Sequence, residues 1–307
     1  MVSPALHAVG VVLLAVAIDL AFGDPPDRWH PVAWIGRALS AGRERLCDGS
    51  PTVLFVSGGA LTLGVIALAA LAGGLVALLG HTLGVAGVVV EAAALKSTLA
   101  LRDLARAARG VSTALAAHDL AGARTQLGFH LVSRPTAALD ASQVASGAIE
   151  SMAENLTDAF VAPLLFYLVL GLPGALAYRA LNTADTMLGY HDGPLEYFGK
   201  LAAKLDDLAN LIPAPLAAVA IVAAAGNAAR AAWWAMIRDH DRTASPNAGW
   251  TMSATAGALD LTLEKPGAYR LGHGRPPTAS DIDQSIRLIA TASVIFLAVV
   301  MLIRLII

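Results

Sequence analysis

Long apolar runs that are almost free of charge constrain the fold of this chain more than any other feature. They cover residues 9–17, 61–79, 83–90 and 286–307. Stretches of about 20 apolar residues are typical of membrane-spanning helices. The chain is 56% hydrophobic and 14% charged, whereas soluble domains contain about 45–50% apolar and about 25% charged residues. The sequence therefore predicts an integral membrane protein.

The charge and the cysteine content exclude several classes of partner and site. The net charge is −2, which argues against nucleic acid as a partner because a nucleic-acid-binding face is basic. Cys47 is the single cysteine, so an intramolecular disulfide and a cysteine-cluster metal site are excluded. Residues 1–22 lack a basic segment and a small-residue cleavage site, and we expect them to form a retained first transmembrane helix.

Four transmembrane helices are expected, at residues 4–22, 52–79, 83–100 and 286–307. The first helix ends at Gly23-Asp24-Pro25-Pro26, since paired prolines cannot continue a helix. The polar loop predicted at 27–50 and the segment that starts at Arg102 are both rich in arginine. Basic residues mark the cytoplasmic side of short loops. Both segments are therefore expected in the cytoplasm, with the N-terminus and the turn at His81 outside.

Two further apolar stretches are interrupted. Residues 160–181 contain Gly171-Leu172-Pro173-Gly174, and residues 212–225 open with Pro213 and Pro215. Such breaks favour re-entrant helical hairpins, which return to the side they left and are tolerated where protein covers the broken backbone. Basic residues follow both stretches, so re-entrance would keep residues 102–287 in the cytoplasm.

The predicted fold is all-α: a polytopic integral membrane protein with about four full transmembrane helices, two re-entrant helical elements and a cytoplasmic helical portion. Residues 101–158 are expected to form mostly water-facing helices, with a break at Ser133-Arg134-Pro135 and a cap at Asp140 or Ser142. We expect a single membrane-embedded domain over 1–307, made of the N-terminal helices (1–101), a portion at the cytoplasmic face (102–285) and the last helix (286–307). Any active site in residues 102–285 would then lie at the cytoplasmic face of the cell membrane.

Three polar clusters border these apolar stretches. In the first, Glu150, Glu154 and Asp158 are spaced by four residues and share one helix face. Like charges at this spacing repel by about 0.2–0.5 kcal/mol per pair. A cation or a basic partner is therefore expected to neutralise them.

The other two clusters combine carboxylates with amides and basic residues. The second holds Arg179, Asn182 and Asp185, and the third holds Asp206, Asp207 and Asn210, preceded by Lys200 and Lys204. Carboxylate and amide oxygens suit Mg²⁺, which usually keeps waters and substrate phosphates as its other ligands. A hairpin at 160–181 would bring the first cluster beside the second, and one pocket at the membrane edge could then hold all three. The alternative is that each cluster is a solvated helix face at the membrane interface.

Other features are weaker. Trp29-His30-Pro31 could be a loop that contacts a ligand, although a histidine beside a tryptophan is more often simply packed. Residues 245–250 form a turn by composition. The sequence contains no G-x4-G-K-[ST] loop, so a nucleotide would be bound in another way.

Many short motifs follow one another in the order of a known family. In the first half they are Gly23-Asp24-Pro25-Pro26, His30-Pro31-Val32, Ile35-Gly36, Lys96-Ser97, Leu101-Arg102, Ser133-Arg134, Glu150-Ser151, Ala153-Glu154-Asn155, Asp158 and Ala162-Pro163. In the second half they are Tyr178-Arg179, Asn182-Thr183, Asp185-Thr186-Met187, Gly189-Tyr190, Phe198-Gly199, Leu205-Asp206-Asp207, Asn210, Ile212-Pro213, Asn247-Ala248-Gly249-Trp250, Met252 and Tyr269-Arg270-Leu271-Gly272. On these motifs the chain resembles, from its first helix to its last, the CobD/CbiB family of cobalamin-biosynthesis membrane proteins, the adenosylcobinamide(-phosphate) synthases.

The resemblance implies an enzyme, an amide-forming ligase. The implied reaction is ATP-dependent amide formation between a carboxylate of adenosylcobyric acid and aminopropanol or aminopropanol O-phosphate, which gives adenosylcobinamide or its phosphate. The implied partners are the corrinoid substrate, the amine, ATP, membrane lipid and other membrane enzymes of late cobalamin assembly, with Mg²⁺ as cofactor. Phosphoryl transfer depends mainly on positioning and charge neutralisation, which the three clusters suit.

Roles for individual residues follow from their spacing and from the resemblance. The expected metal ligands are Glu150, Glu154, Asp158, Asp185, Asp206 and Asp207, and the expected catalytic residues among them are Glu154, Asp185, Asp206 and Asp207. The expected substrate-binding residues are His30, Arg134, Asn155, Arg179, Asn182, Lys200, Lys204, Asn210, Asn247, Gly249 and Trp250. The basic members would offset phosphate charge, the asparagines of the clusters would position phosphates or corrin amides, and His30 with residues 247–250 would line the corrinoid surface.

Three alternatives stay open at this point. One is an AmpE-like membrane sensor or signalling protein, which shares the general layout. Another is a Mg²⁺-dependent membrane transferase of phosphorylated lipids, which would explain Asp206, Asp207 and Asn210 but not the motifs at 23–36 or 247–250. A transporter is the general default for a polytopic chain with broken helices, but no inverted repeat is visible.

Overall fold

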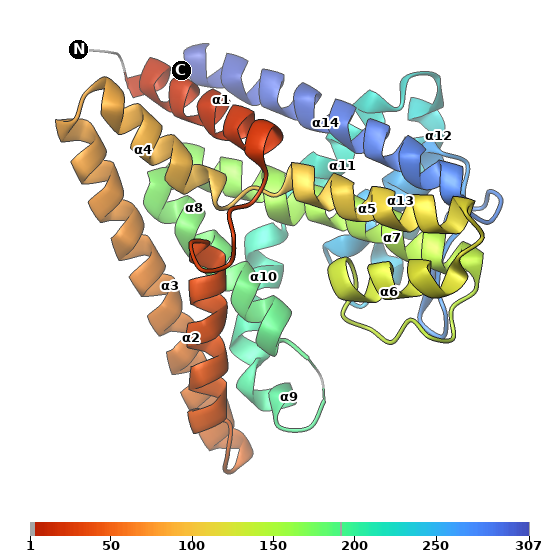
Figure 1. The fold of residues 1–307 in the computed structure, drawn as a ribbon, viewed down its shortest axis with the longest axis horizontal. Helices are drawn as coiled ribbons and strands as arrows, with labels where there is room; N and C mark the ends of the chain where they lie inside the picture. Colours follow the sequence, from red (N-terminus) through yellow and green to blue (C-terminus); the bar gives the residue numbers. More distant parts are fainter. Residues whose placement is uncertain (1–3, 191, 307) are drawn as a thin grey trace. The chain divides into compact units, whose positions relative to one another are not determined.

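The computed structural model describes residues 4–190 and 192–306, and these form two compact units. Unit 1 comprises Met1–Ala100, Ala162–Asn210 and Arg304–Ile307, and unit 2 comprises Leu101–Val161 and Leu211–Ile303. The helices of unit 1 are α1 (Pro4–Phe22), α2 (Pro31–Leu46), α3 (Pro51–Thr82), α4 (Val85–Lys96), α8 (Ala162–Leu188), α9 (Leu195–Phe198) and α10 (Lys200–Asn210) (Figure 1).

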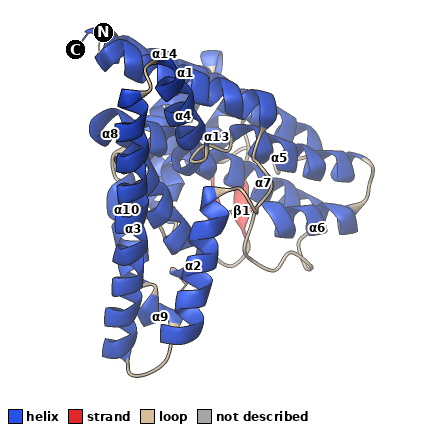
Figure 2. Cartoon of the chain, turned by 60° about the vertical axis from the view of Figure 1, so that its left-hand side comes forward, coloured by secondary structure: helices blue, strands red, loops and turns tan. Residues whose placement is uncertain are grey.

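Unit 2 contains helices and one small sheet. Its helices are α5 (Leu101–Ala116), α6 (Leu120–His130), α7 (Ala141–Leu156), the π-helical turn η1 (Thr157–Val161), α11 (Pro213–Ala224), η2 (Gly226–Ala228), α12 (Ala229–Asp239), η3 (His240–Arg242), α13 (Ala248–Ala258) and most of α14 (Ala279–Ile306). The strands β1 (Leu263–Lys265) and β2 (Tyr269–Leu271) form an antiparallel hairpin, drawn in red in Figure 2. This hairpin was not predicted from the sequence.

Four helical stretches are long and apolar enough to cross a membrane: Ala5–Phe22, Pro51–Thr82, Ala141–Leu188 and Ala279–Ile306. Taken as one broken span, α10 and α11 would add a fifth. Only 17% of the apolar window in α3 is buried, and Leu68, Leu71 and Leu75 on that helix are each more than half exposed. Lipid would cover such a surface. The predicted class, an all-α polytopic membrane protein, is confirmed.

Two predictions about the N-terminal third are wrong. Residues 83–100 do not form a span, because α4 has 12 residues and is about 18 Å long, whereas the hydrocarbon core is about 30 Å thick. Residues 27–50 are not a loop, because α2 occupies most of them. His30 caps this helix by accepting a hydrogen bond from the Val32 backbone N–H, and Pro31 takes the first helical position, where its missing N–H costs nothing.

The predicted break in the stretch 160–181 is confirmed as a helical hairpin. Gly171 adopts φ 68° and ψ −164° inside α8, a conformation open essentially to glycine alone. The rings of Phe166 and Tyr178 stack with centroids 5.0 Å apart, although 12 residues of straight helix would separate them by about 18 Å. The two halves of α8 therefore fold back on each other. The re-entrance of this element into the membrane stays a prediction.

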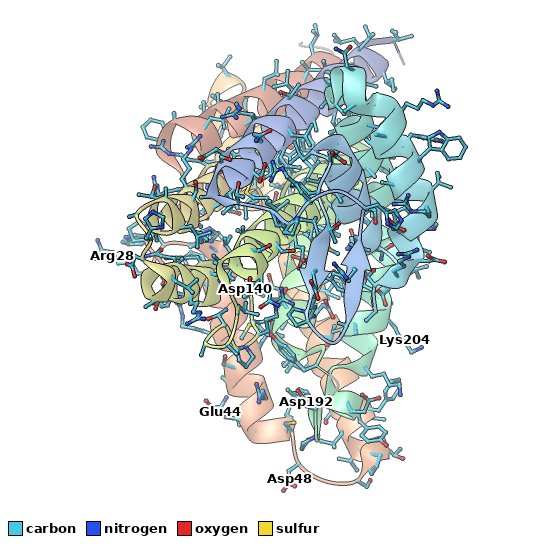
Figure 3. The ribbon with its side chains drawn as sticks, turned by 90° about the vertical axis from the view of Figure 1, so that its right-hand side faces the viewer. Arg28, Glu44, Asp48, Asp140, Asp192 and Lys204 are labelled. Carbon is cyan, nitrogen blue, oxygen red and sulfur yellow. The ribbon has the colours of Figure 1, made fainter. Side chains whose placement is uncertain are left out.

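The core of unit 1 is built where α2, α3, α8, α9 and α10 meet. Its buried residues are Leu39, Leu54, Val65, Ala180, Ala184, Leu188, Leu195, Phe198 and Ala202. Glycine makes one contact possible: a Cβ on Gly58 of α3 would lie 1.9 Å from the carbonyl oxygen of Phe198. Charged residues gather at one end of unit 1, where Glu44, Asp48 and Asp192 lie in or beside exposed connections (Figure 3).

In unit 2, α7 is central. Asp140 begins it with a capping box that uses Gln143, which confirms one of the two predicted caps. Every residue from Val144 to Ala153 is buried, so the expectation of a mostly water-facing helix is wrong here. Helices α5, α6 and α13 and strand β1 pack against α7, which explains the burial.

Candidate functional site

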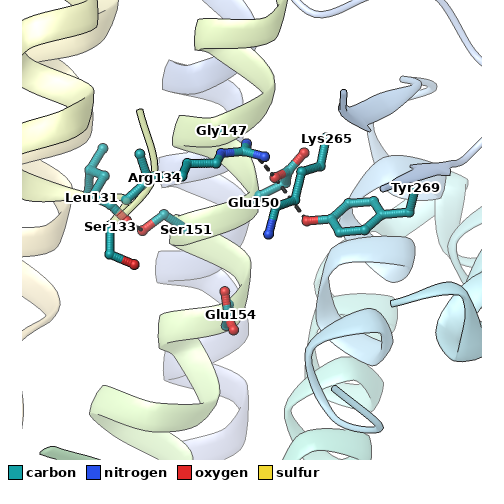
Figure 4. Close-up of a pocket in the computed structure, with 10 residues that line it drawn as sticks. Leu131, Ser133, Arg134, Gly147, Glu150, Ser151, Glu154, Lys265 and Tyr269 are labelled. Carbon is teal, nitrogen blue, oxygen red and sulfur yellow. Dashed lines mark hydrogen bonds and ion pairs between the residues drawn. The ribbon is translucent and has the colours of Figure 1, made fainter. Parts of the chain in front are cut away.

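A polar pocket of about 260 Å³ lies in unit 2 between α7, the segment that follows α6 and the β1–β2 hairpin (Figure 4). Two cations, two carboxylates and three hydroxyl groups contribute to its wall. The lining residues are Leu131, Val132, Ser133, Arg134, Gly147, Glu150, Ser151, Glu154, Lys265 and Tyr269. The arrangement combines groups that bind anions with groups that bind cations.

Glu150 connects the three walls of this pocket. Its Oε1 accepts a hydrogen bond of 2.8 Å from the Ser146 hydroxyl, and its Oε2 lies 3.2 Å from Arg134 Nη2 and accepts a hydrogen bond of 3.1 Å from the Tyr269 hydroxyl. Figure 4 shows Arg134 and Tyr269 approaching the carboxylate from opposite sides. Arg134 is thus the basic partner expected for the acidic face of α7.

The hairpin is fixed to α7 through the same carboxylate. The backbone N–H of Glu264 donates to Ser146 Oγ at 2.6 Å, and this hydroxyl in turn donates to Glu150. Lys265 and Tyr269 are cross-strand partners, so their side chains leave the same face of the hairpin. The Lys265 ammonium lies 6.0 Å from the centroid of the Tyr269 ring. Both side chains therefore reach the pocket together.

The electrostatic surroundings keep Tyr269 protonated. Burial raises the pKa of its phenol, and the negative charges of Glu150 and Glu154 raise it further. A neutral phenol donates a hydrogen bond, whereas a phenolate beside two carboxylates would be repelled. Tyr269 is therefore a stable donor to Glu150 throughout the neutral pH range.

The second and third predicted clusters come together in unit 1. The buried carboxylate of Asp206 accepts hydrogen bonds from Asn182 at 3.4 Å and from Asn210 at 3.0 Å. The Tyr178 hydroxyl donates to Asn210 Oδ1 at 2.9 Å, and Arg179 Nη1 donates to Asn182 Oδ1 at 3.3 Å. These residues form one polar network between α8 and α10.

Three other predicted residues of unit 1, Lys200, Lys204 and His30, lie outside this network. Lys200 faces Glu196 at 3.6 Å, and Lys204 is exposed (Figure 3). His30 Nε2 lies 3.3 Å from the Asp24 carboxylate, which also contacts the ammonium of buried Lys96. Burial raises the pKa of the Asp24 carboxyl, but hydrogen bonds from His30 and Lys96 and their charges outweigh it, so that the net pKa is lowered.

Asn155, Asp158 and residues 247–250 belong to unit 2 but do not line the pocket. The Asn155 amide donates to the Ser151 carbonyl at 2.9 Å, and Asp158 lies in η1. A Cβ on Gly249 would lie 1.9 Å from the carbonyl oxygen of His240. The Trp250 ring centroid lies 3.9 Å from that of His240. Gly249 and Trp250 therefore pack the start of α13 against η3.

Comparison with known proteins decides the family. A family model described as CobD/Cbib protein matches residues 12–291. The cobalamin biosynthesis protein CobD of Dehalococcoides mccartyi is 40% identical over 296 residues, which cover 94% of this chain and 95% of that protein. The chain belongs to the CobD/CbiB family.

Two further family members are similarly close. The probable cobalamin biosynthesis protein CobD of Methanothermobacter thermautotrophicus is 40% identical over 270 residues, with 87% of this chain and 88% of that protein covered. The cobalamin biosynthesis protein CobD of Brucella suis is 41% identical over 271 residues, with 84% and 82% covered. No solved structure matches the chain. In this CobD/CbiB member the matched region contains both the pocket of unit 2 and the polar network of unit 1.

The donors do not form a metal cage made by protein alone. Within residues 4–190 and 192–306, no group of three or more His, Cys, Asp or Glu side chains is close enough to share an ion. Donors of the protein already engage both oxygens of Glu150 and of Asp206. Mg²⁺ is commonly bound by one or two carboxylates together with substrate phosphates. A Mg²⁺ ion held by these residues would therefore need substrate phosphates as further ligands.

Two residues that complete the pocket of this CobD/CbiB member, Lys265 and Tyr269, were not predicted as site residues from the sequence. In the sequence, Lys265 is one of several basic residues beyond the apolar stretch 212–225, and Tyr269 stands out only as part of a family motif. The available signal was Gly267, which turns at φ 73° between the two strands and pairs Lys265 with Tyr269. Three-residue strands are too short to show a clear alternation.

Proposed function

We propose that this chain is the cobalamin-biosynthesis enzyme that joins a carboxylate of adenosylcobyric acid to aminopropanol or aminopropanol O-phosphate, with ATP as co-substrate. The product is adenosylcobinamide or its phosphate. The observation that carries the proposal is the family match over residues 12–291, together with relatives near 40% identity whose names state cobalamin biosynthesis.

The chemistry of the proposed step has two parts. A carboxylate oxygen of the corrinoid first attacks the γ-phosphorus of ATP, which releases ADP and leaves an acyl phosphate. The amine nitrogen then attacks the acyl carbon, the C–N bond forms, the C–O bond to phosphate breaks, and the nitrogen loses a proton. Positioning and charge neutralisation provide most of the acceleration in such phosphoryl transfers.

The residues described above have separate tasks in this proposal. Arg134 and Lys265 attract anionic groups into the pocket of unit 2, and Glu150 holds Arg134 and Tyr269 in place. Glu154, one turn along α7, presents a carboxylate to the same pocket. In unit 1, Asp206 with Asn182 and Asn210 offers a buried network of amides around a carboxylate.

We propose Mg²⁺ as the ion that accompanies ATP. It would neutralise phosphate charge and orient the γ-phosphoryl group. Asp185 and Asp207, both in unit 1, are the carboxylates proposed to supply its protein ligands. The protein is proposed to act at the cytoplasmic face of the cell membrane, where ATP is available.

The test is a reaction with purified components. The protein in detergent is incubated with adenosylcobyric acid, Mg-ATP and each amine in turn, and the corrinoid products are analysed by mass spectrometry. We expect a mass increase equal to the amine minus water and one ADP for each product formed. A preparation carrying Glu154→Gln and Arg134→Met serves as the inactive control.

A genetic experiment separates this function from the alternatives. Deletion of the gene should cause corrinoid auxotrophy that cobinamide relieves and cobyric acid does not. A membrane sensor or a transferase of lipid phosphates would not give this pattern. Absence of product with both amines, combined with growth of the deletion strain on cobyric acid, would reject the proposal.

A further inference from the structure

The pocket of unit 2 carries charges of both signs in separate places. Arg134 and Lys265 supply the positive charge, and Glu154 lies one helical turn from Glu150 along α7. A guanidinium has five N–H donors, and the hydrogen bond to Glu150 occupies one of those on Arg134. The other donors of Arg134 and the Lys265 ammonium can therefore bind a ligand anion.

The size of the pocket restricts what it can hold. Its volume is about 260 Å³, below the range of about 300–1,000 Å³ that is usual for sites of drug-sized ligands. A corrin ring is much larger than such ligands, so this pocket does not enclose the corrinoid. A small co-substrate is the reactant that fits.

We propose that this pocket binds the amine co-substrate as a zwitterionic aminoalkyl phosphate. Its phosphate contacts Arg134 and Lys265, and its ammonium group faces Glu154. The inference rests on the proposed function and adds to it the residues that bind the amine.

The charges distinguish this ligand from the two obvious competitors. The polyphosphate of ATP is strongly anionic and carries no ammonium group, so Glu154 would repel it. Free aminopropanol would satisfy Glu154 but would offer no anion to the Lys265 ammonium or to the donors of Arg134 that Glu150 does not occupy. A ligand with one phosphate and one ammonium group balances both ends.

The β1–β2 hairpin carries one basic residue that lines the pocket and one that does not. Lys265 and Arg270 lie on the two strands of the same hairpin, but Lys265 pairs with Tyr269 toward the pocket, whereas Arg270 pairs with Glu264. Arg270 is 69% exposed and lies 3.8 Å from Glu264. Arg270→Ala is therefore a matched control: it removes a positive charge from the hairpin without removing it from the pocket.

The experiment is calorimetric titration of the full-length protein in detergent, which requires no turnover. The probes are aminopropanol O-phosphate, free aminopropanol, propanediol phosphate, inorganic phosphate and ATP. We expect wild type to bind aminopropanol O-phosphate at least about tenfold more tightly than free aminopropanol, propanediol phosphate or inorganic phosphate. Lys265→Ala should weaken this binding by about tenfold or more, Lys265→Arg should restore most of it, and Arg270→Ala should leave it unchanged.

Glu154→Gln tests the other end of the ligand. It should weaken binding of aminopropanol O-phosphate but not of propanediol phosphate, which lacks the amine. The wild-type preference for the amine-bearing phosphate should therefore shrink. Thermal unfolding of each variant, compared with wild type, shows whether the fold is kept.

Three results would overturn the assignment. In the first, Lys265→Ala binds aminopropanol O-phosphate as wild type does. In the second, Lys265→Ala weakens the binding of ATP but not that of aminopropanol O-phosphate. Lys265 would then bind a phosphate of the nucleotide. In the third, wild type binds free aminopropanol as tightly as it binds aminopropanol O-phosphate. A failure of the proposed function is recognised separately, because both amines would then give no product even where binding is retained.

Discussion

The ion pair between Arg134 and Glu150 offers the most direct test of how the pocket is held together. The side chains are 20% and 7% exposed, and their closest atoms are 3.2 Å apart. Removing one partner of a buried pair costs about 3–5 kcal/mol, because the other charge is left uncompensated. Since Arg134 keeps some contact with solvent, we expect Glu150→Ala and Arg134→Met each to lose about 3 kcal/mol of unfolding free energy.

The double variant separates the pair from its surroundings. The double variant leaves no uncompensated buried charge. Its loss of unfolding free energy should therefore be about 2 kcal/mol smaller than the sum of the losses in the two single variants. Glu150→Ala should cost somewhat more than Arg134→Met, because it also removes the acceptor of the Ser146 and Tyr269 hydroxyls.

The measurement is thermal unfolding in one detergent, monitored as the fraction of protein that stays monodisperse. In a chain of this length, 1 kcal/mol shifts the midpoint by about 2 °C, so each single variant should unfold about 6 °C earlier. The exposed pair of Glu264 and Arg270 is the control, and its disruption should shift the midpoint by less than about 2 °C. Strictly additive effects in the double variant, or single shifts no larger than those of the control, would refute a buried ion pair as the centre of the pocket.

Three further predictions concern unit 1. Gly58→Ala places a methyl group 1.9 Å from the Phe198 carbonyl oxygen and should destabilise the protein by about 1–3 kcal/mol. Gly64→Ala meets nothing within 4 Å and should keep or raise the stability, because alanine favours a helix over glycine; equal thermal midpoints would contradict the close contact. Gly171→Ala forces a side chain into a positive-φ conformation and should cost about 1–3 kcal/mol, seen as a lower midpoint; an unchanged midpoint would contradict the strain. The pKa of Asp24 is lowered, so its stabilising effect is present above the unfolded value of about 3.9 and is lost as pH falls through the lower folded value. Wild type should therefore lose more stability than Asp24→Asn between pH of about 6 and about 3, and parallel pH curves would disprove it.

Hydrophobic runs predict the outer helices well. The first helix was expected at residues 4–22 and is Pro4–Phe22, and the second was expected at 52–79 and is Pro51–Thr82. The run at 83–100 was wrongly predicted to span the membrane, because a sequence does not distinguish apolar residues covered by lipid from those covered by protein. In α4, Glu91 and Lys96 are buried by other helices, and only the tertiary structure shows this.

The site was predictable to the extent that its residues share one helix. Glu150 and Glu154 followed from their spacing, and the contact of Asn182 with Asp206 is the part of the expected common pocket that the structure shows. Lys265 and Tyr269 did not follow, because their place depends on a hairpin more than 100 residues after α7 in the chain. The expectation of one pocket for all three clusters stays a prediction, since the first cluster belongs to unit 2 and the other two to unit 1.

The interleaving of the two units along the chain has a consequence for biosynthesis. Unit 2 begins at Leu101, is interrupted after Val161 by a segment of unit 1, and resumes at Leu211. Its long-range bonds join Glu150 to Tyr269 and Ser112 to Asp283, 119 and 171 residues apart. The acidic face of α7 therefore emerges from the ribosome long before the hairpin that neutralises and encloses it. A chain that stops before Tyr269 would keep the carboxylates of α7 and lack the complete pocket. Binding of a ligand in this pocket should therefore require synthesis to have passed the hairpin.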